Sequence, residues 1–124
     1  MEITLAIPTK NAKGLDDVVN EVFARSNYFT LIKVDLSSNS YSIVKIIRNE
    51  FTSLSYGVGP IVAKMLKDEG VDVIATPELG HGLRELINEL GLKYIIVNPN
   101  VRLNTIMNEV INHLKRLYGG PAGI

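Results

Sequence analysis

Two glycine-rich segments, residues 56–60 (Tyr-Gly-Val-Gly-Pro) and residues 80–82 (Gly-His-Gly), carry the residue types best suited to holding a small ligand. Each segment lies directly before a stretch with helical spacing of apolar residues, so each is expected to open a helix. The first turn of a helix has unpaired N–H groups, and such groups bind anions. The sequence therefore predicts a ligand site at the starts of these two helices.

His81 is the residue of these segments that could ligate a metal. A neutral imidazole binds metals and a protonated one holds anions. The alternative is an exposed loop histidine with no ligand, because a single histidine without a partner ligand is a weak metal signal. The sequence contains no cysteine, which excludes a cluster held by protein thiolates. His113 falls in the last predicted helix and is expected at the surface, away from this site.

Three basic side chains, those of Lys10, Lys13 and Arg25, are expected near the same loops and could supply charge to an anionic ligand. Taken singly, such a residue is more often a solvated surface residue. The glycines have two explanations as well, since they either cradle an anion with their N–H groups or let the loop approach the sheet closely. The predicted cofactor-binding residues are Lys10, Lys13, Arg25, Tyr56, Gly57, Gly59, Gly80, His81 and Gly82, with His81 as the metal ligand.

The composition indicates one domain with a substantial core, because the chain has 124 residues of which 46% are hydrophobic. The 13 basic and 13 acidic side chains cancel, which argues against a nucleic-acid partner. No run approaches the roughly 20 apolar residues of a membrane span. We expect a cytoplasmic protein, a monomer or homodimer, with a domain over residues 1–118 and a flexible tail over residues 119–124.

The elements that must position these residues can be read from hydrophobic periodicity and turn signals. Strands are predicted at residues 3–7, where Pro8 ends the strand, and at residues 28–35, 41–48, 71–75 and 92–97. Helices are predicted at about residues 16–25, then from Pro60 to Gly70, along the stripe from Leu83 to Leu90, and from Leu103 to Leu117.

A hairpin followed by strand-helix-strand units predicts an α/β fold with a mixed five-stranded sheet. The simplest order in space is 3-2-1-4-5, with strand 2 antiparallel and strands 1, 4 and 5 buried between helices. This is the three-layer, ribonuclease H-like arrangement, and it brings the loops after strands 1, 3, 4 and 5 to one edge. The nuclease reaction of that fold needs clustered carboxylates beginning in the first strand. Residues 3–7 contain no acid, so we expect no catalysis.

Several segments, in order and spacing, resemble the dinitrogenase iron-molybdenum cofactor biosynthesis family, which includes NifX, NafY and the C-terminal part of NifB. The resemblance runs from about Ile3 to Leu117. At two positions where many members carry histidine, this chain has Val22 and Tyr56. The segments that carry the resemblance are residues 3–8, 14–16, 23–25, 28–29, 57–60, 69–74 and 79–80.

The resemblance implies a ribonuclease H-like fold and a non-catalytic carrier or chaperone-type domain. Such a domain would bind an iron-sulfur or iron-molybdenum-type cluster or its precursor, and its partner would be a cluster donor or acceptor protein. A second reading remains open: a protein-interaction or small-anion-binding module that has kept the fold and lost the cofactor.

Overall fold

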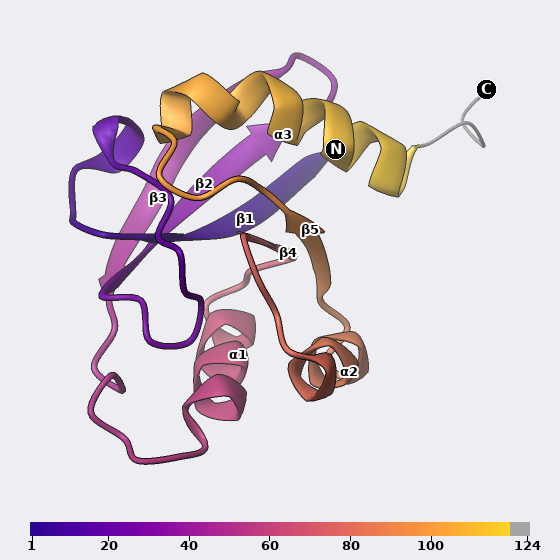
Figure 1. Ribbon diagram of the computed structural model, residues 1–124. Helices are drawn as coiled ribbons and strands as arrows, with labels where there is room; N and C mark the ends of the chain where they lie inside the picture. Colours follow the sequence, from indigo (N-terminus) through magenta and orange to yellow (C-terminus); the bar gives the residue numbers. More distant parts are fainter. Residues whose placement is uncertain (120–124) are drawn as a thin grey trace.

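The computed structural model describes residues 1–119, and all five predicted strands and the last three predicted helices are present (Figure 1). None of the helices within these residues is both long and apolar enough to cross a bilayer. Beyond Gly119, the predicted flexible tail lies outside the described residues. The elements are β1 (Glu2–Thr9), the 3-10 turn η1 (Gly14–Asp16), β2 (Tyr28–Asp35), β3 (Ser40–Arg48), α1 (Val58–Asp68), β4 (Val73–Thr76), α2 (His81–Glu89), β5 (Lys93–Ile96) and α3 (Leu103–Tyr118).

The prediction of an α/β fold with a mixed sheet is confirmed, and the strand order is β3-β2-β1-β4-β5. β1 pairs with β2 in antiparallel fashion along its whole length, and with β4 in parallel at Leu5 and Ala6. β4 and β5 are parallel, and β3 is antiparallel to β2. The strands β1, β3, β4 and β5 therefore run in one direction and end at one edge of the sheet.

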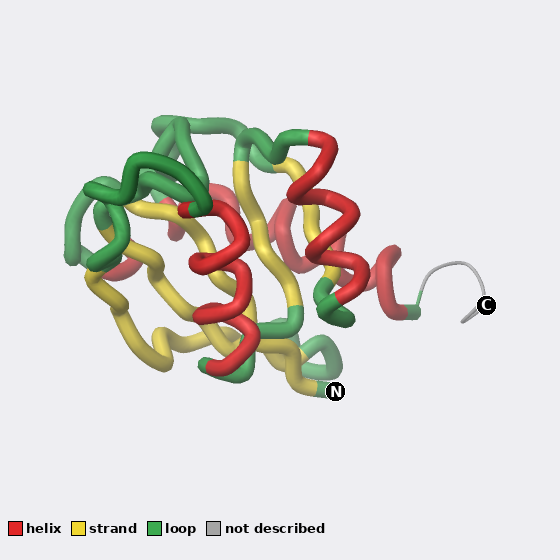
Figure 2. The backbone as a smooth tube through the Cα atoms, turned by 90° about the horizontal axis from the view of Figure 1, so that it is seen from below, coloured by secondary structure: helices red, strands yellow, loops and turns green. Residues whose placement is uncertain are grey.

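Helices cover both faces of the sheet, with α3 alone on one face and α1 and α2 on the other (Figures 1 and 2). Alternation along β1 divides its side chains between the two cores, since successive residues of a strand point to opposite faces. Ile3, Leu5 and Ile7 pack in the core beneath α3, whereas Ala6 packs in the core beneath α1 and α2. A central strand buried on both faces explains the nearly continuous apolar run at the start of the sequence.

The prediction that Pro8 ends the first strand is wrong, because β1 continues to Thr9. The parallel ladder with β4 involves only Leu5 and Ala6, so Pro8 lies beyond it, and its one regular strand partner is β2. On the other side, an isolated bridge uses the Pro8 carbonyl as an acceptor, so a proline, which has no N–H group, is tolerated there.

The predicted helix over residues 16–25 is also wrong. This segment forms the short turn η1 and then runs in an extended and turning path with two isolated bridges, Thr9 to Val19 and Val18 to Arg102. Asp17 was interpreted as a first-turn acid of a helix, but its buried carboxylate accepts N–H groups from the loop after β1. Bonds to distant parts of the chain therefore override the helical spacing of the apolar residues.

The two edges of the sheet differ. β3 exposes much of its surface and contains a register shift opposite Leu31 and Ile32, and its lysine and arginine side chains suit an edge near solvent. β5 was predicted to be buried between helices, and this is wrong for part of the strand. It pairs with β4 only, and Ile96 is 43% exposed. An edge strand of four residues is too short and too far from the sheet centre for the helices to cover completely.

Candidate functional site

A single segment, residues 18–26, connects the loops that follow four strands of the sheet; we call it the cross-edge segment. At β1, the N–H of Asn20 donates to the carbonyl of Pro8 at 2.8 Å. At the loop after β5, the N–H of Val19 donates to the carbonyl of Val101 at 3.0 Å. These bonds hold the segment against the edge where the strands end.

The same segment reaches the loops after β3 and β4. The N–H of Phe23 donates to the carboxylate Oε1 of Glu78 at 3.2 Å. The side-chain amide of Asn49, which is 4% exposed, donates to the carbonyls of Ala24 and Ser26 at 2.8 Å each. The cross-edge segment thus fixes all four loops relative to one another without being a regular helix or strand.

Phe23 anchors the cross-edge segment in the core beneath α1 and α2. Its side chain is 1% exposed, and its ring lies 5.5 Å from that of Phe29 in an edge-to-face arrangement. The adjacent Val22 is 43% exposed and Tyr56 is 87% exposed. The two positions where the family often carries histidine are therefore surface positions in this chain.

The starts of α1 and α2 lie against each other, as the site prediction requires. Gly57 precedes α1 with φ of 76°, a left-handed conformation that favours glycine. A Cβ added at Gly59 would lie 3.5 Å from the Leu83 side chain in the first turn of α2. No side chain caps the N-terminus of either helix, so the first N–H groups of both helices remain available to a ligand.

His81 is the first residue of α2, and its side chain is 90% exposed. Its Nε2 lies 3.2 Å from Oε1 of Glu85, one helical turn later. Within residues 1–119, no group of three or more His, Asp or Glu side chains is arranged to hold a metal ion.

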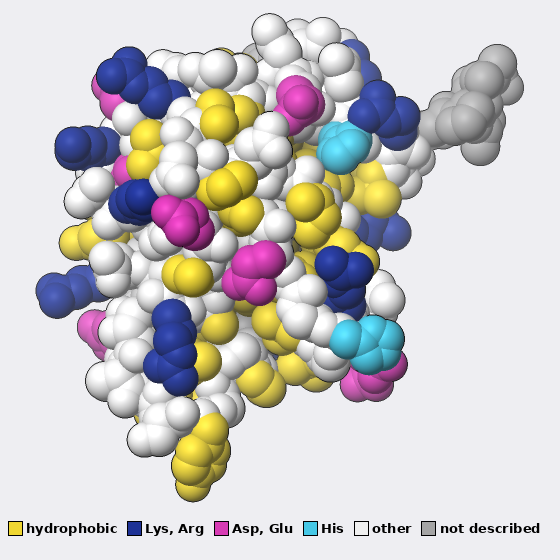
Figure 3. Space-filling model, in the orientation of Figure 1, with side chains coloured by type: hydrophobic (Ala, Val, Ile, Leu, Met, Phe, Trp, Pro, Cys, Tyr) yellow, Lys and Arg dark blue, Asp and Glu magenta, His cyan; other side chains and the backbone are white. Residues whose placement is uncertain are grey.

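The three predicted basic residues have different surroundings. Lys10 Nζ lies 3.7 Å from Oε1 of Glu21 in the cross-edge segment, and Lys13 is exposed next to η1. Arg25 donates to the backbone carbonyl of Thr52 at 2.9 Å, which ties the loop after β3 to the cross-edge segment. Lysine and arginine side chains are interspersed with acidic ones over the face shown in Figure 3. The positive charge is therefore local rather than a broad field.

Lys10 also contributes to a polar cavity of about 330 Å³ at the same edge. Sequence reasoning missed the other cation, Arg48, because its position in a predicted strand gives no sign of a neighbouring cavity. The available signal was its position as the last residue of a strand that ends at the ligand edge. The cavity is lined by Lys10, Asn11, Asn27, Tyr28, Arg48, Asn49 and Thr52.

A family model described as dinitrogenase iron-molybdenum cofactor matches residues 1–113. The chain belongs to the dinitrogenase iron-molybdenum cofactor family. No curated protein matches it. The family assignment agrees with the resemblance inferred from the short segments along the sequence.

Solved structures with the same fold include other small proteins. The crystal structure of PH0822 superposes with a TM-score of 0.70, with 22% identity over 90% of this chain and 92% of that one. The apo form of the orange protein from Desulfovibrio gigas superposes with a TM-score of 0.72, with 22% identity over 89% of this chain and 88% of that one. An NMR structure of a Thermotoga protein described as NifB superposes with a TM-score of 0.64, with 22% identity over 90% of this chain and 88% of that one. At this identity, these similarities establish the fold of this family member.

Proposed function

We propose that this chain is a non-catalytic cytoplasmic carrier of an anionic iron-sulfur or iron-molybdenum-type cluster, or of its precursor. It would receive the cluster from one protein and deliver it to another. Membership of the cofactor family supports this proposal. The structural observation that carries it is the contact between the uncapped starts of α1 and α2 beside the cross-edge segment.

The proposed mechanism is capture by charge. The first N–H groups of two adjacent helices point their positive ends toward the edge, and this favours a negatively charged guest. Because the chain has no cysteine, the cluster must bring its own sulfur ligands. His81 then acts as a single terminal ligand or, when protonated, as a further positive charge. The proposed site residues remain Lys10, Lys13, Arg25, Tyr56, Gly57, Gly59, Gly80, His81 and Gly82.

We also infer that the fold is a ribonuclease H-like variant adapted to binding. The strand order and directions support this inference. The only acid of β1 is Glu2, which is exposed at the start of the strand and far from the ligand edge. A nuclease centre built on a carboxylate of the first strand is therefore not part of the proposal.

A second candidate function is binding of a small oxyanion without a metal cluster. The polar cavity beside Lys10 and Arg48 favours it, because two cations and several amide groups surround a volume of about 330 Å³. This site needs no metal ligand, and it lies on the hairpin side of the same edge. The two functions share Lys10 but otherwise use different residues, so substitutions of His81 and of Arg48 can separate them.

Anaerobic reconstitution with ferrous iron, sulfide and molybdate tests the carrier proposal, with visible absorption and metal content as readouts. The native chain is compared with His81→Ala and with His113→Ala as the matched histidine control. Bound metal that depends on His81 but not on His113 supports a carrier with one protein ligand. Equal amounts of bound metal in all three proteins would overturn the assignment of His81 as the metal ligand.

No metal uptake in any of these proteins would overturn the carrier proposal. The small-oxyanion alternative is then tested by calorimetry with phosphate and with molybdate. Arg48→Ala should abolish that binding, since it removes one of the two cations of the cavity. Unchanged binding by Arg48→Ala would exclude the cavity as the site.

A further inference from the structure

Within residues 1–119, no strand pairs with the outer edge of β5, and this edge offers backbone groups for pairing. Lys93 and Val97 donate their N–H groups inward, at 3.0 and 3.2 Å, to carbonyls of the β4 segment. Successive residues of a parallel strand alternate in the direction of their backbone groups. The N–H and C=O groups of Tyr94 and Ile96 therefore point away from the sheet, where another strand could bind them.

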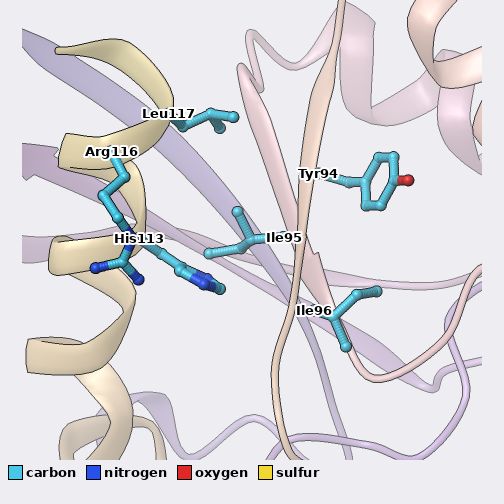
Figure 4. Close-up of a pocket in the computed structure, with 6 residues that line it drawn as sticks. All are labelled: Tyr94, Ile95, Ile96, His113, Arg116 and Leu117. Carbon is cyan, nitrogen blue, oxygen red and sulfur yellow. The ribbon is translucent and has the colours of Figure 1, made fainter. Parts of the chain in front are cut away.

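A groove of about 410 Å³ runs beside this edge, between β5 and the C-terminal half of α3. In Figure 4, Ile95 points toward α3, whereas Tyr94 and Ile96 point to the opposite side of the strand. Ile96 and Leu117 are large apolar side chains that remain 43% and 39% exposed. The groove is lined by Tyr94, Ile95, Ile96, His113, Arg116 and Leu117.

The groove carries basic side chains. Arg116 and His113 belong to its lining, which contains no aspartate or glutamate. Lys93 Nζ lies 5.6 Å from the centre of the Tyr118 ring at the end of α3. The guanidinium of Arg84 lies 5.5 Å from the centre of the Tyr94 ring in β5. Figure 3 shows dark blue and yellow side chains together on this right-hand flank of the molecule. An occupant that complements this surface is acidic as well as apolar.

We propose that β5 and α3 form a docking surface for an extended, acidic segment of a partner protein, which pairs with β5 as an additional strand. Glutamate side chains on one face of the segment would lie along Ile95 and place their carboxylates near Arg116 and Lys93. Apolar side chains on the other face would cover Tyr94 and Ile96. Main-chain hydrogen bonds supply affinity in this mode of recognition, and alternate side chains supply specificity.

A second copy of this chain fits the edge less well. Pairing β5 with its own copy about a twofold axis would bring Arg116 and Lys93 of both copies to the same interface. Like charges brought together at an interface cost free energy and select against that partner. Charge thus favours an acidic partner over self-association.

The probe is the peptide acetyl-Glu-Ile-Glu-Val-Glu-Ile-amide, titrated into the full chain at low salt by calorimetry and amide NMR. We expect saturable binding that weakens with added salt, with the largest shifts at Tyr94 and Ile96. The same peptide with lysine in place of glutamate should not bind. Equal binding of the two peptides would overturn the proposal.

Charge reversal on α3 tests the role of the groove. Arg116→Glu should weaken binding of the acidic peptide about tenfold or more, because it places a like charge in the lining. Lys115→Glu makes the same charge change at the neighbouring exposed position, outside the lining, and should leave the affinity within about twofold. Equal losses of peptide affinity in both variants would mean that only the net charge of the chain matters. That result would overturn the groove as the binding site.

Methylation of the peptide backbone tests strand pairing without altering the protein. One peptide is N-methylated at its odd positions and another at its even positions, because only one set of N–H groups can face β5. One pattern should abolish binding and the other should retain it. Binding by both peptides would overturn strand pairing. A stable dimer of the free chain that Ile96→Asp dissociates would instead assign this edge to a second copy.

Discussion

At the scale of single residues, Asp17 is the clearest case of a polar side chain that holds the loops. It is 1% exposed, and its carboxylate accepts N–H groups from Asn11, Lys13 and Val18 at 2.9 to 3.2 Å. Asp17→Ala leaves these donors without a partner and should lower the free energy of unfolding by about 3 kcal/mol. Urea denaturation measures this loss. Asp16→Ala, at an exposed neighbour, should stay within about 0.5 kcal/mol, and equal losses would contradict the role of Asp17.

Tyr118 gives a residue-scale prediction about pH. Burial, and secondarily the negative charge of Asp72, raise the pKa of its phenol above the ordinary 10.0. A folded-state pKa above the unfolded value contributes stability that is complete below the unfolded value and is lost as pH rises through the folded one. The native chain should therefore lose stability more steeply above pH 10.0 than Tyr118→Phe does. Urea midpoints measured on both sides of that pH test this difference, and parallel profiles would refute it.

At the scale of elements, two glycines at the helix starts should respond to alanine substitution with opposite changes in stability. Gly57→Ala forces a left-handed alanine before α1 and should cost about 1 kcal/mol. Gly82→Ala, inside α2 with open space around the added Cβ, should instead stabilise the chain by about 0.5 kcal/mol. Thermal unfolding should show a lower melting temperature for Gly57→Ala and a higher one for Gly82→Ala. A destabilising Gly82→Ala would show that this glycine has a structural role that its surroundings do not indicate.

The cross-edge segment carries a second element-scale prediction. Phe23→Ala removes the ring that anchors this segment and should lower the free energy of unfolding by about 3 to 4 kcal/mol. Because the same segment binds four loops, hydrogen exchange should increase in all of them together. Val22→Ala, at the exposed neighbour, should change stability by less than about 0.5 kcal/mol. Faster hydrogen exchange confined to residues near Phe23 would contradict the claim that the cross-edge segment holds the four loops together.

At the scale of the whole molecule, the sheet was predictable because its signals are local. The hairpin and the helix-linked strands follow from hydrophobic period and from turn residues, and right-handed crossovers then leave few possible orders. The first predicted helix failed because its outcome depends on distant partners. Val19 bonds to Val101 and Phe23 bonds to Glu78, and no local window of sequence contains both members of either pair.

The position of the two glycine-rich loops was predictable, whereas the binding residues assigned to them stay a prediction. The convergence of the loops follows from the topology alone, and the 3.5 Å between a Cβ added at Gly59 and the Leu83 side chain agrees with it. The polar cavity was missed because Lys10, Asn27 and Arg48 come from three separate strand ends. Such a cavity depends on the side-chain directions and register of a hairpin, and composition and spacing do not specify these.

The placement of α3 alone on one face of the sheet has a consequence for synthesis of the chain. The face of β1 formed by Ile3, Leu5 and Ile7 is made first, and the helix that covers it is made after every strand. A nascent chain therefore exposes a bare apolar sheet face until translation passes α3. Such a face favours aggregation, and the time needed to synthesise the chain from β1 to the end of α3 sets how long it stays uncovered.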